Sequence, residues 1–489
     1  MANIIDNIVG VFSPKAAYQR EQYRRAMDKV RKYDAAALGR RTDSWHATGT
    51  DANQEIRAAL SRLVDRSREL GRNNPYAVKA IKVIANNTVG TGIRATPLVE
   101  GKQALKRLKK EWKDWAETKK CDFDGQLNFY GMQRLAMRSI AEGGEVLIRI
   151  HRTPKERIPI QLQLLEGDFL DMTKDLYILE GGGRIINGVE FNAEGKRVAY
   201  WLYENHPGST YGNLVSNRIP VEEVIHVYEM LRIGQVRGVP FGVSAMLRLR
   251  DFDLYEDAQL LRQQIAACFS VFITDVNGVV NPAEKKTDLT EKVEPGIIQR
   301  LTAGENVEFA APPGAEGYSD YSRNVLQAIA AGYGIPYEAL TGNLKDVNFS
   351  SGRMGWLEFS RQVQDWQENM LIPSFCQPVW EAFITAASLR GVVRDVAEVS
   401  WTAPRREMID PLKETEAIQK QIENGLVTWP EAVRQMGYDP EEVLTEMDKI
   451  IKRLDELGIK IAGDFRNTME MKKKEPRAAA DGSQPQEQK

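Results

Sequence analysis

Cysteine is scarce in this chain, with only three in 489 residues. They stand far apart, at Cys121, Cys268 and Cys376, without a CxxC pair. This spacing matches none of the usual zinc patterns and gives no basis for a disulfide framework. We therefore expect reduced thiols of the kind found in cytosolic proteins.

Long apolar runs and an excess of one charge are also missing. No run of about 18 apolar residues occurs, so we expect no membrane-spanning helix and no membrane partner. The N-terminus lacks the basic start and apolar stretch of a secretory signal. The 66 basic and 68 acidic side chains leave a net charge of −2, so the chain has no overall cationic field for gripping DNA along its length.

The sequence contains no recognisable catalytic constellation. His151, His206 and His226 match no HExxH or other close ligand pair, and we interpret them as ordinary strand or loop histidines. The glycines at Gly90 and Gly92 follow a predicted helix and lack the spacing of a phosphate loop, so we expect a helix stop and turn there. We predict no catalytic residue, no cofactor and no metal, and favour a structural or binding role over an enzyme.

The residues that are present predict an α+β fold of several domains. A chain of 489 residues is too long for one hydrophobic core. Helical periodicity begins at Asp51, and alternating apolar residues from Glu145 to Arg152 open a run of strands. A turn at Asn192–Gly195 indicates a hairpin, and we expect the sheets to be mostly antiparallel.

Two long helices are predicted, from Gly242 to Cys268 and from Ser319 to Tyr333. Apolar residues of the first recur at alternating threes and fours, a seam suited to packing on neighbouring helices. The seam residues are Leu247, Leu254, Ala258, Leu261 and Ile265.

The first long helix also carries an acidic face, made of Asp253, Glu256 and Asp257. It lacks the histidine or calcium-type loop of a metal site, so we interpret it as a solvated face. A small β module is expected between the two helices, with a hairpin that pairs Gly296–Leu301 with Asn306–Ala310.

A polar loop between apolar helices is the most distinctive candidate for a functional surface. Gly334 and Pro336 end the second long helix, and a short helical segment then ends at Gly342. The loop that follows has no apolar periodicity, and Ser350 or Ser351 can cap the next helix. Its polar residues are Asn343, Lys345, Asp346, Asn348, Ser350 and Ser351. Loops on such scaffolds often present functional surfaces, although an ordinary helix connection is the alternative.

The next helix has one apolar face, and the C-terminal part is a series of capped helices. The face consists of Trp356, Phe359, Val363, Trp366 and Met370, and Pro373 is expected to break or kink the helix after it. Cap signals follow at Asp410, Thr428 and Asp439.

Six blocks of sequence occur in a fixed order between about residue 70 and residue 440. They are RNNPYAVKAI with VGTGI, LQLLEGDFL, VIHVYEMLRIGQVRGVP, AAGYGIPYEALTG, NFSSGRMG and IDPLKETEAI. Together these blocks resemble the lambda-type bacteriophage portal proteins.

The resemblance implies the portal fold, in which each subunit has a wing, a two-helix stem, a small β clip and an α-helical crown. The implied boundaries are an N-terminal arm at 1–50, the wing at 51–241, stem helix 1 at 242–268, the clip at 269–318, stem helix 2 at 319–333, the channel-loop region at 334–353, wing helices at 354–404, the crown at 405–460 and a disordered tail at 461–489.

The resemblance also implies a homo-oligomeric ring, usually a dodecamer, at one vertex of a phage head. Double-stranded DNA would pass through its channel during packaging and ejection, and the polar loop and acidic stem face would lie along that path. The implied protein partners are the terminase large subunit, the major capsid or scaffold protein and a head–tail adaptor. The implied location is the virion, with the host cytoplasm during assembly. Alternatives are another ring component of head–tail joining or, less favoured, a packaging nuclease or ATPase.

Overall fold

The computed structural model describes most of the chain from residue 47 onward. The described ranges are 47–175, 178–179, 181–210, 214–267, 271–275, 305–309, 317–345, 347–393, 397–404 and 410–459, with residue 408 and a few isolated positions before 47. The chain divides into two units, Met1–Gln54 and Glu55–Lys489. The elements discussed below belong to the second unit, apart from the first residues of α3. Cys268 and the predicted tail lie outside the described residues.

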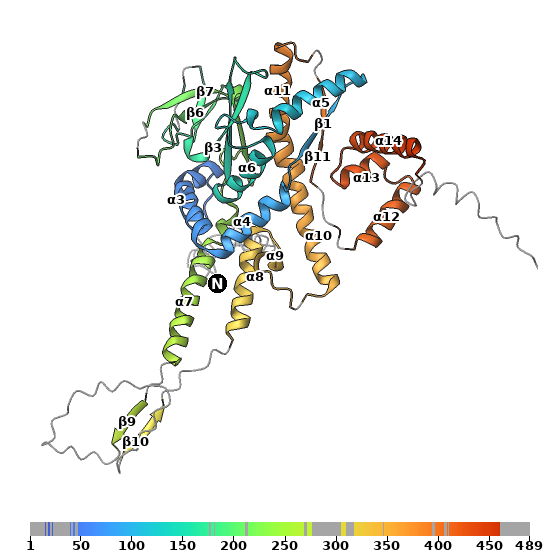
Figure 1. Cartoon of the computed structure of the whole chain (residues 1–489). Coiled ribbons are helices and arrows are strands. Elements are labelled where there is room, and N and C mark those ends of the chain that lie inside the picture. The colour runs from blue at the N-terminus through green and yellow to red at the C-terminus, as the bar shows by residue number, and fades with distance from the viewer. Residues whose placement is uncertain are drawn as a thin grey trace, which may run out of the picture. The chain divides into compact units, whose positions relative to one another are not determined.

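Four helices open the second unit (Figure 1): α3 (Ala52–Asn73), α4 (Pro75–Thr88), α5 (Lys102–Ala116) and α6 (Phe129–Gly143). The Asn74 side chain accepts hydrogen bonds from the backbone N–H groups of Tyr76 and Ala77, and Pro75 begins α4. This arrangement satisfies donors that the first helical turn leaves unpaired. The turn at Gly90 and Gly92, both with positive φ, follows α4 as predicted.

The described strands form four small sheets, and every strand pair is antiparallel, as predicted. One sheet has the order β3–β2–β8 and another β4–β5–β6–β7, while β1 pairs with β11 and β9 with β10. The bounds are β1 (Arg94–Leu98), β2 (Glu145–Arg152), β3 (Ile160–Glu166), β4 (Arg184–Ile186), β5 (Val189–Phe191), β6 (Arg197–Tyr203), β7 (Ser216–Pro220), β8 (Val224–Tyr228), β9 (Val271–Asp275), β10 (Glu305–Phe309) and β11 (Glu398–Thr402).

The two predicted long helices are present as α7 (Met246–Ala267) and α8 (Tyr318–Tyr333). Gly334 ends α8 in the left-handed region at φ 69°, and the short α9 (Tyr337–Thr341) follows. Between α7 and α8 the described strands are β9 and β10, which pair with each other. The predicted partner strand at 296–301 lies outside the described residues.

The helix after the polar loop continues past the predicted break. It runs as α10 (Phe349–Asp365), a π-helical segment (Trp366–Cys376) and α11 (Gln377–Leu389). Pro373 lies inside the π-helical segment. A wider turn accommodates a proline that lacks an N–H and would clash in a regular helix. The predicted apolar face packs into the main core through Phe359, Val363 and Trp366.

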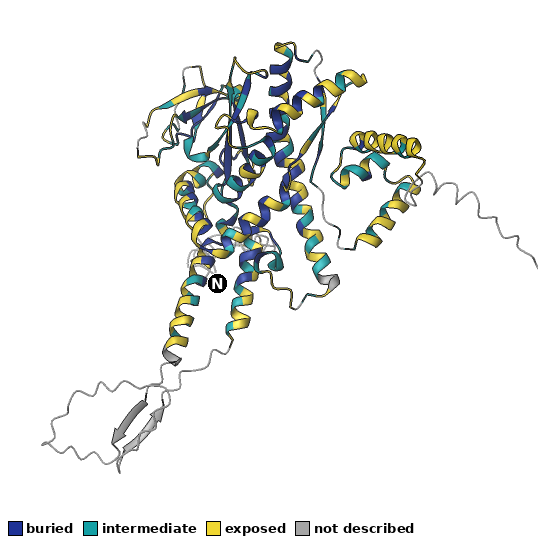
Figure 2. Cartoon of the chain, viewed as in Figure 1, coloured by how far each residue is buried: buried dark blue, intermediate teal, exposed yellow. Residues whose placement is uncertain are grey.

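The C-terminal helices are α12 (Pro411–Glu423), α13 (Trp429–Gln435) and α14 (Pro440–Leu457), each with the predicted cap. Figure 2 shows them as largely exposed. Among the described residues, α12 buries no side chain, α13 buries Ala432 and α14 buries Pro440. In the part of the chain that the structure covers, no helix combines the length and apolar character needed to cross a bilayer.

Candidate functional site

The polar loop after α9 is held by local hydrogen bonds at its start. Gly342 takes the left-handed conformation at φ 72° and ends α9. The Thr341 hydroxyl accepts from the Asn343 N–H at 3.2 Å, and the Asn343 side-chain oxygen accepts from the Lys345 N–H at 3.1 Å. Such side-chain turns fix the backbone without a sheet or helix. Lys345 is exposed at the surface of this turn.

The predicted helix cap in this loop is wrong. Helix α10 begins at Phe349, so Ser350 and Ser351 lie inside its first turn. Asn348 occupies the position before the helix, and its carbonyl accepts from the Gly352 N–H at 3.0 Å. Asparagine is as good a capping residue as serine, so the sequence alone did not identify the true start. Asp346 and the side chains of both serines lie outside the described residues.

The acidic face of α7 is not the solvated face that we predicted. Asp253 accepts from the Asn74 side-chain amide at 2.7 Å, and Glu256 accepts from the Tyr318 hydroxyl at 3.2 Å. Burial raises the pKa of Glu256. Only Asp257 is exposed. Neighbouring elements supply the donors, because α7 packs against the start of α4 and the start of α8.

The predicted seam of α7 is exposed along the subunit. Leu247, Leu254 and Leu261 have 71%, 51% and 57% of their surface accessible, and Ala258 between them is exposed as well. The Ile265 side chain lies outside the described residues. These three leucines are spaced by seven residues, so they form a continuous stripe along the helix. The described part of the subunit therefore leaves half or more of the surface of each of these leucines uncovered.

A different face of α7 packs within the subunit. Leu249 and Phe252 are buried in the main core, and the Tyr255 ring lies against Tyr318 and Tyr321 of α8, with centroids 6.0 Å and 4.5 Å away. Helix α7 therefore has two apolar faces, one covered by its own chain and one uncovered.

A buried ionic network that no sequence pattern indicated joins the two larger sheets. The Glu145 carboxylate accepts from Arg237 Nε at 2.8 Å, from His226 Nε2 at 2.9 Å and from the Gly238 N–H at 3.0 Å. Arg237 also donates to the Asn187 carbonyl. Burial would raise the pKa of Glu145, but Arg237 and His226 outweigh it and lower that pKa to about 2. Burial lowers the pKa of His226.

The two other histidines that the structure describes, His151 and His206, have structural surroundings. His151, in β2, contacts the Gln163 side chain at 2.8 Å and stacks on Phe123. His206 approaches Glu166 at 3.1 Å, and these two with Asp168 bring three potential ligand atoms within 4.8 Å. The cation already present there is Arg68, whose Nη2 lies 2.5 Å from Asp168 and 3.0 Å from Glu166. The arrangement is an ion-pair cluster that a metal could enter only by displacing Arg68.

Two of the three cysteines are described, and both are free and buried. Burial raises the pKa of Cys121 to about 12 and also raises the pKa of Cys376. A protonated, buried thiol is a poor nucleophile and a poor metal ligand. These two thiols therefore pack as small apolar groups.

Comparison with solved structures finds portal proteins and related particles, at low identity. The neck of the native gene transfer agent particle computed with C12 symmetry aligns at 16% identity and a TM-score of 0.45, covering 76% of this chain and 94% of the other. The HK97-family phage portal protein from Corynebacterium diphtheriae aligns at 10% identity and a TM-score of 0.34, covering 72% and 97%.

Comparison of this sequence with those of known proteins identifies its family. The chain is 26% identical to the probable portal protein of Halomonas phage phiHAP-1, over 88% of each chain. It is 22% identical to portal protein B of Escherichia phage lambda, over 93% of this chain and 97% of that one. The model of the phage portal protein, lambda family, matches residues 38–367, well over half of the chain. The chain belongs to the lambda family of phage portal proteins.

Proposed function

We propose that this chain assembles into a closed homo-oligomeric ring that carries double-stranded DNA through its channel. The observation that carries the proposal is the uncovered seam of α7, three leucines at heptad spacing with half or more of their surface exposed. Heptad stripes pack against other helices. Burying a leucine side chain fully stabilises by roughly 1.5–3 kcal/mol, so three such residues per interface supply a driving force for association.

Ring closure follows from using two different faces of the subunit. The covered face of α7 is occupied by its own α8, so the seam must meet another surface of the next copy. Contacts between unlike faces generate a ring when the rotation closes. Each subunit then contributes one α7–α8 pair to the wall of the channel. We propose twelve subunits, the usual number in portal proteins.

The proposed domains keep the boundaries expected from the sequence. Residues 51–241 and 354–404 form the wing, 242–268 and 319–333 the stem, 269–318 the clip and 405–460 the crown. We propose that the assembled ring sits in the virion at one capsid vertex, after assembly in the host cytoplasm. There it would bind the terminase large subunit, the major capsid or scaffold protein and a head–tail adaptor. Its role would be structural and not catalytic.

The loop from Gly342 to Gly352 is the proposed contact with passing DNA. Lys345 is exposed and would give one phosphate contact per subunit that is sensitive to salt and independent of base sequence. Asn348 is exposed beside it. Ser350 and Ser351, in the first turn of α10, leave backbone N–H groups near the same edge.

The stem would repel DNA phosphates less strongly than an acidic face of three exposed residues would. Asp253 and Glu256 are engaged by their own subunit, so Asp257 is the member that can face the channel. A sparse negative charge would repel phosphates weakly and let the duplex slide.

Electron microscopy of the purified chain tests the proposal. We expect rings with a central hole, and class averages give the subunit number directly. Particles without a central hole at micromolar protein, with and without capsid partners, would contradict it. A globular oligomer without a hole would favour the alternative of a different head–tail component.

A further inference from the structure

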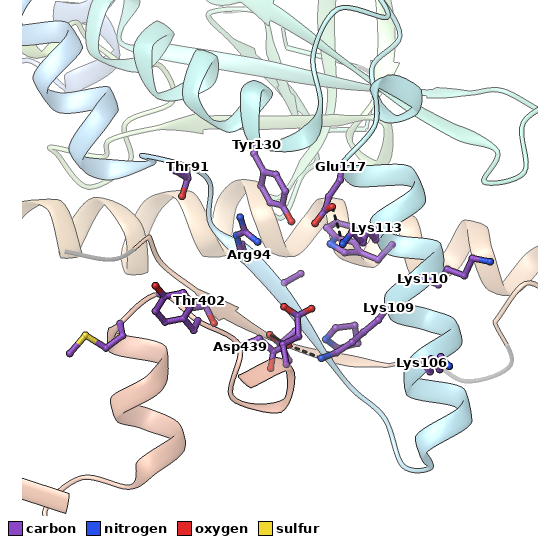
Figure 3. A pocket seen from close by; sticks show the side chains of 18 residues that line it. Thr91, Arg94, Lys106, Lys109, Lys110, Lys113, Glu117, Tyr130, Thr402 and Asp439 are labelled. Carbon is purple, nitrogen blue, oxygen red and sulfur yellow. Dashed lines mark hydrogen bonds and ion pairs between the residues drawn. The ribbon is translucent and has the colours of Figure 1, made fainter. Parts of the chain in front are cut away.

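A cavity of about 560 Å³ lies between β1, α5 and the turn that joins α13 to α14 (Figure 3). Five cationic and three acidic side chains line it. They are Arg94, Lys106, Lys109, Lys110 and Lys113, and Glu117, Asp439 and Glu442. A second cavity of about 590 Å³ adds Arg134 and shares five lining residues with the first, namely Thr91, Arg94, Lys113, Glu117 and Tyr130. In a chain with net charge −2, this is a local concentration of positive charge.

The two arginines of this region have no acidic partner among the described residues. Lys109 pairs with Asp439 at 2.7 Å, and Lys113 approaches Glu117 at 3.6 Å. Arg94 instead lies over the Tyr130 ring, 5.7 Å from its centroid. Figure 3 shows Arg94, Lys113 and Tyr130 gathered around one space, whereas Lys110 extends away from it. The guanidinium donors of Arg94 are therefore available to a ligand.

One of the three acidic side chains in the first cavity, Asp439, is held directly by donors of the cavity wall. The Asp439 carboxylate accepts from Lys109 Nζ at 2.7 Å and from the Thr96 hydroxyl at 3.2 Å. It also caps α14 by accepting from the Glu441 N–H. Burial would raise the pKa of Asp439, but Lys109 outweighs it and the pKa is lowered. The walls of the cavity thus stabilise an oxyanion.

Neutral donors complete the walls. Burial raises the pKa of Tyr130 to about 12, so its hydroxyl stays protonated and can donate. The Thr402 hydroxyl is buried in the wall and has no hydrogen-bond partner among the described residues. A buried polar group of this kind usually has a water or ligand partner in solution.

We propose that these adjoining cavities form a phosphate-binding site built on Arg94, Arg134, Lys113 and the Tyr130 hydroxyl. Arginine suits phosphate because its planar donors bind two oxygens at once. A phosphate that also recruits Lys109 competes with Asp439, so binding there loosens the contact between the C-terminal helices and α5. The phosphate comes either from the DNA backbone or from a free phosphate compound.

Titration of the full-length protein tests the site, with inorganic phosphate and a short DNA duplex as separate probes. Isothermal calorimetry follows the first and fluorescence anisotropy the second. We expect Arg94→Gln with Arg134→Gln to weaken binding at least tenfold. We expect Asp439→Asn to strengthen it several-fold, because asparagine keeps the α14 cap but frees Lys109. Lys102→Ala is the matched control, since Lys102 is exposed on α5 outside both cavities. This variant should bind each probe with the affinity of the parent protein.

The two probes separate the two sources. If the protein binds the duplex, and if this binding weakens with added salt and in the double variant, the site binds DNA. If the protein binds inorganic phosphate but not the duplex, the site binds a free phosphate compound. Binding of neither probe, or equal binding by the double variant and Lys102→Ala, overturns the proposal. Circular dichroism of each variant verifies that the fold is retained.

Discussion

The proposed wing and the C-terminal helices differ sharply in the apolar side chains that they bury. In the proposed wing, α4 places Ile81 and Ile84 in the core, and the rings of Trp380 and Phe383 in α11 both pack edge-on against Trp112. In the C-terminal part, α12 has no buried described residue and α14 has one. N-caps do not account for this difference, because α12, α13 and α14 all have a side-chain cap whereas α11 has none.

The difference shows that a cap sets where a helix starts and not what stabilises it. Short helices are marginal in water, and most of their stability comes from packing an apolar face. The wing obtains this packing from its own chain. The stem seam and the C-terminal helices leave apolar side chains exposed, among them Leu254 and Leu444. We infer that the wing is complete as a monomer and that the other regions gain their packing on assembly.

Breaking the buried network should have the largest effect, because it lies in the self-sufficient region. Arg237→Met leaves the Glu145 carboxylate buried with His226 as its remaining side-chain partner, and we expect a loss of about 3–5 kcal/mol of unfolding free energy. Urea unfolding followed by circular dichroism measures it. The control is Arg361→Ala, which breaks an exposed pair with Glu358 and should change stability by less than about 0.5 kcal/mol. Equal losses in both variants would mean that the network is dispensable.

Truncating apolar residues in both regions sharpens the comparison directly. Phe383 is fully buried, so Phe383→Ala should cost about 3–5 kcal/mol through lost burial and a cavity. Leu444 is 46% exposed, so Leu444→Ala should cost well under about 1 kcal/mol in the unassembled subunit. Thermal unfolding of dilute, unassembled protein is the measurement. A Leu444 effect as large as that of Phe383 would show that the C-terminal helices already have a core.

Acid should destabilise the wing in two stages. The pKa of His226 is lowered in the fold, so the unfolded chain takes up that proton first and stability falls as pH drops below about 6.5. The pKa of Glu145 is lowered to about 2, so its contribution is fully present above about 4.5 and is lost between there and 2. Unfolding free energy against pH, measured for the parent and for His226→Gln, separates the stages. A parent curve that is flat from pH 7 to 4 would refute the first stage.

The sequence predicted features whose signals are local. The sequence predicts the caps at Asp410 and Thr428 and the end of α8 at Gly334 and Pro336, because each signal acts within a few residues. The network of Arg237 with Glu145 joins positions 92 apart, and β1 pairs with β11 from nearly the other end of the chain. No periodic pattern encodes such pairings.

The candidate site divides in the same way. The seam of α7 followed from its spacing, but the sequence could not show that Asp253 and Glu256 face neighbouring elements instead of solvent. The cap at Asn348 was missed because three residues suited to capping stand close together. The cations of the cavity around Arg94 come from β1, α5 and α6, which only the fold brings together.

The smallest effect on stability is expected in the loop. Lys345 and Asn348 are exposed, so replacing both by alanine should leave unfolding and ring formation unchanged. Packaging or retention of DNA should fall, and the salt dependence of DNA binding should lose about 0.9 in log–log slope per phosphate contact removed. Quantitative packaging assays with Lys413→Ala as a surface control measure the change. Normal packaging and retention by the double variant would make the loop a simple connector.

The most direct test of whether the α7 seam holds the ring together is the mass of the purified particle. Light scattering coupled to gel filtration should give a multimeric ring for the parent chain. Leu254→Asp combined with Leu261→Asp should give monomers with unchanged thermal stability, because both leucines are more than half exposed in the subunit. Gln263→Asp, at an exposed position on α7 that is not a seam residue, should still assemble. A double variant that forms rings of the same mass as the parent would contradict the claim that this seam holds the ring together.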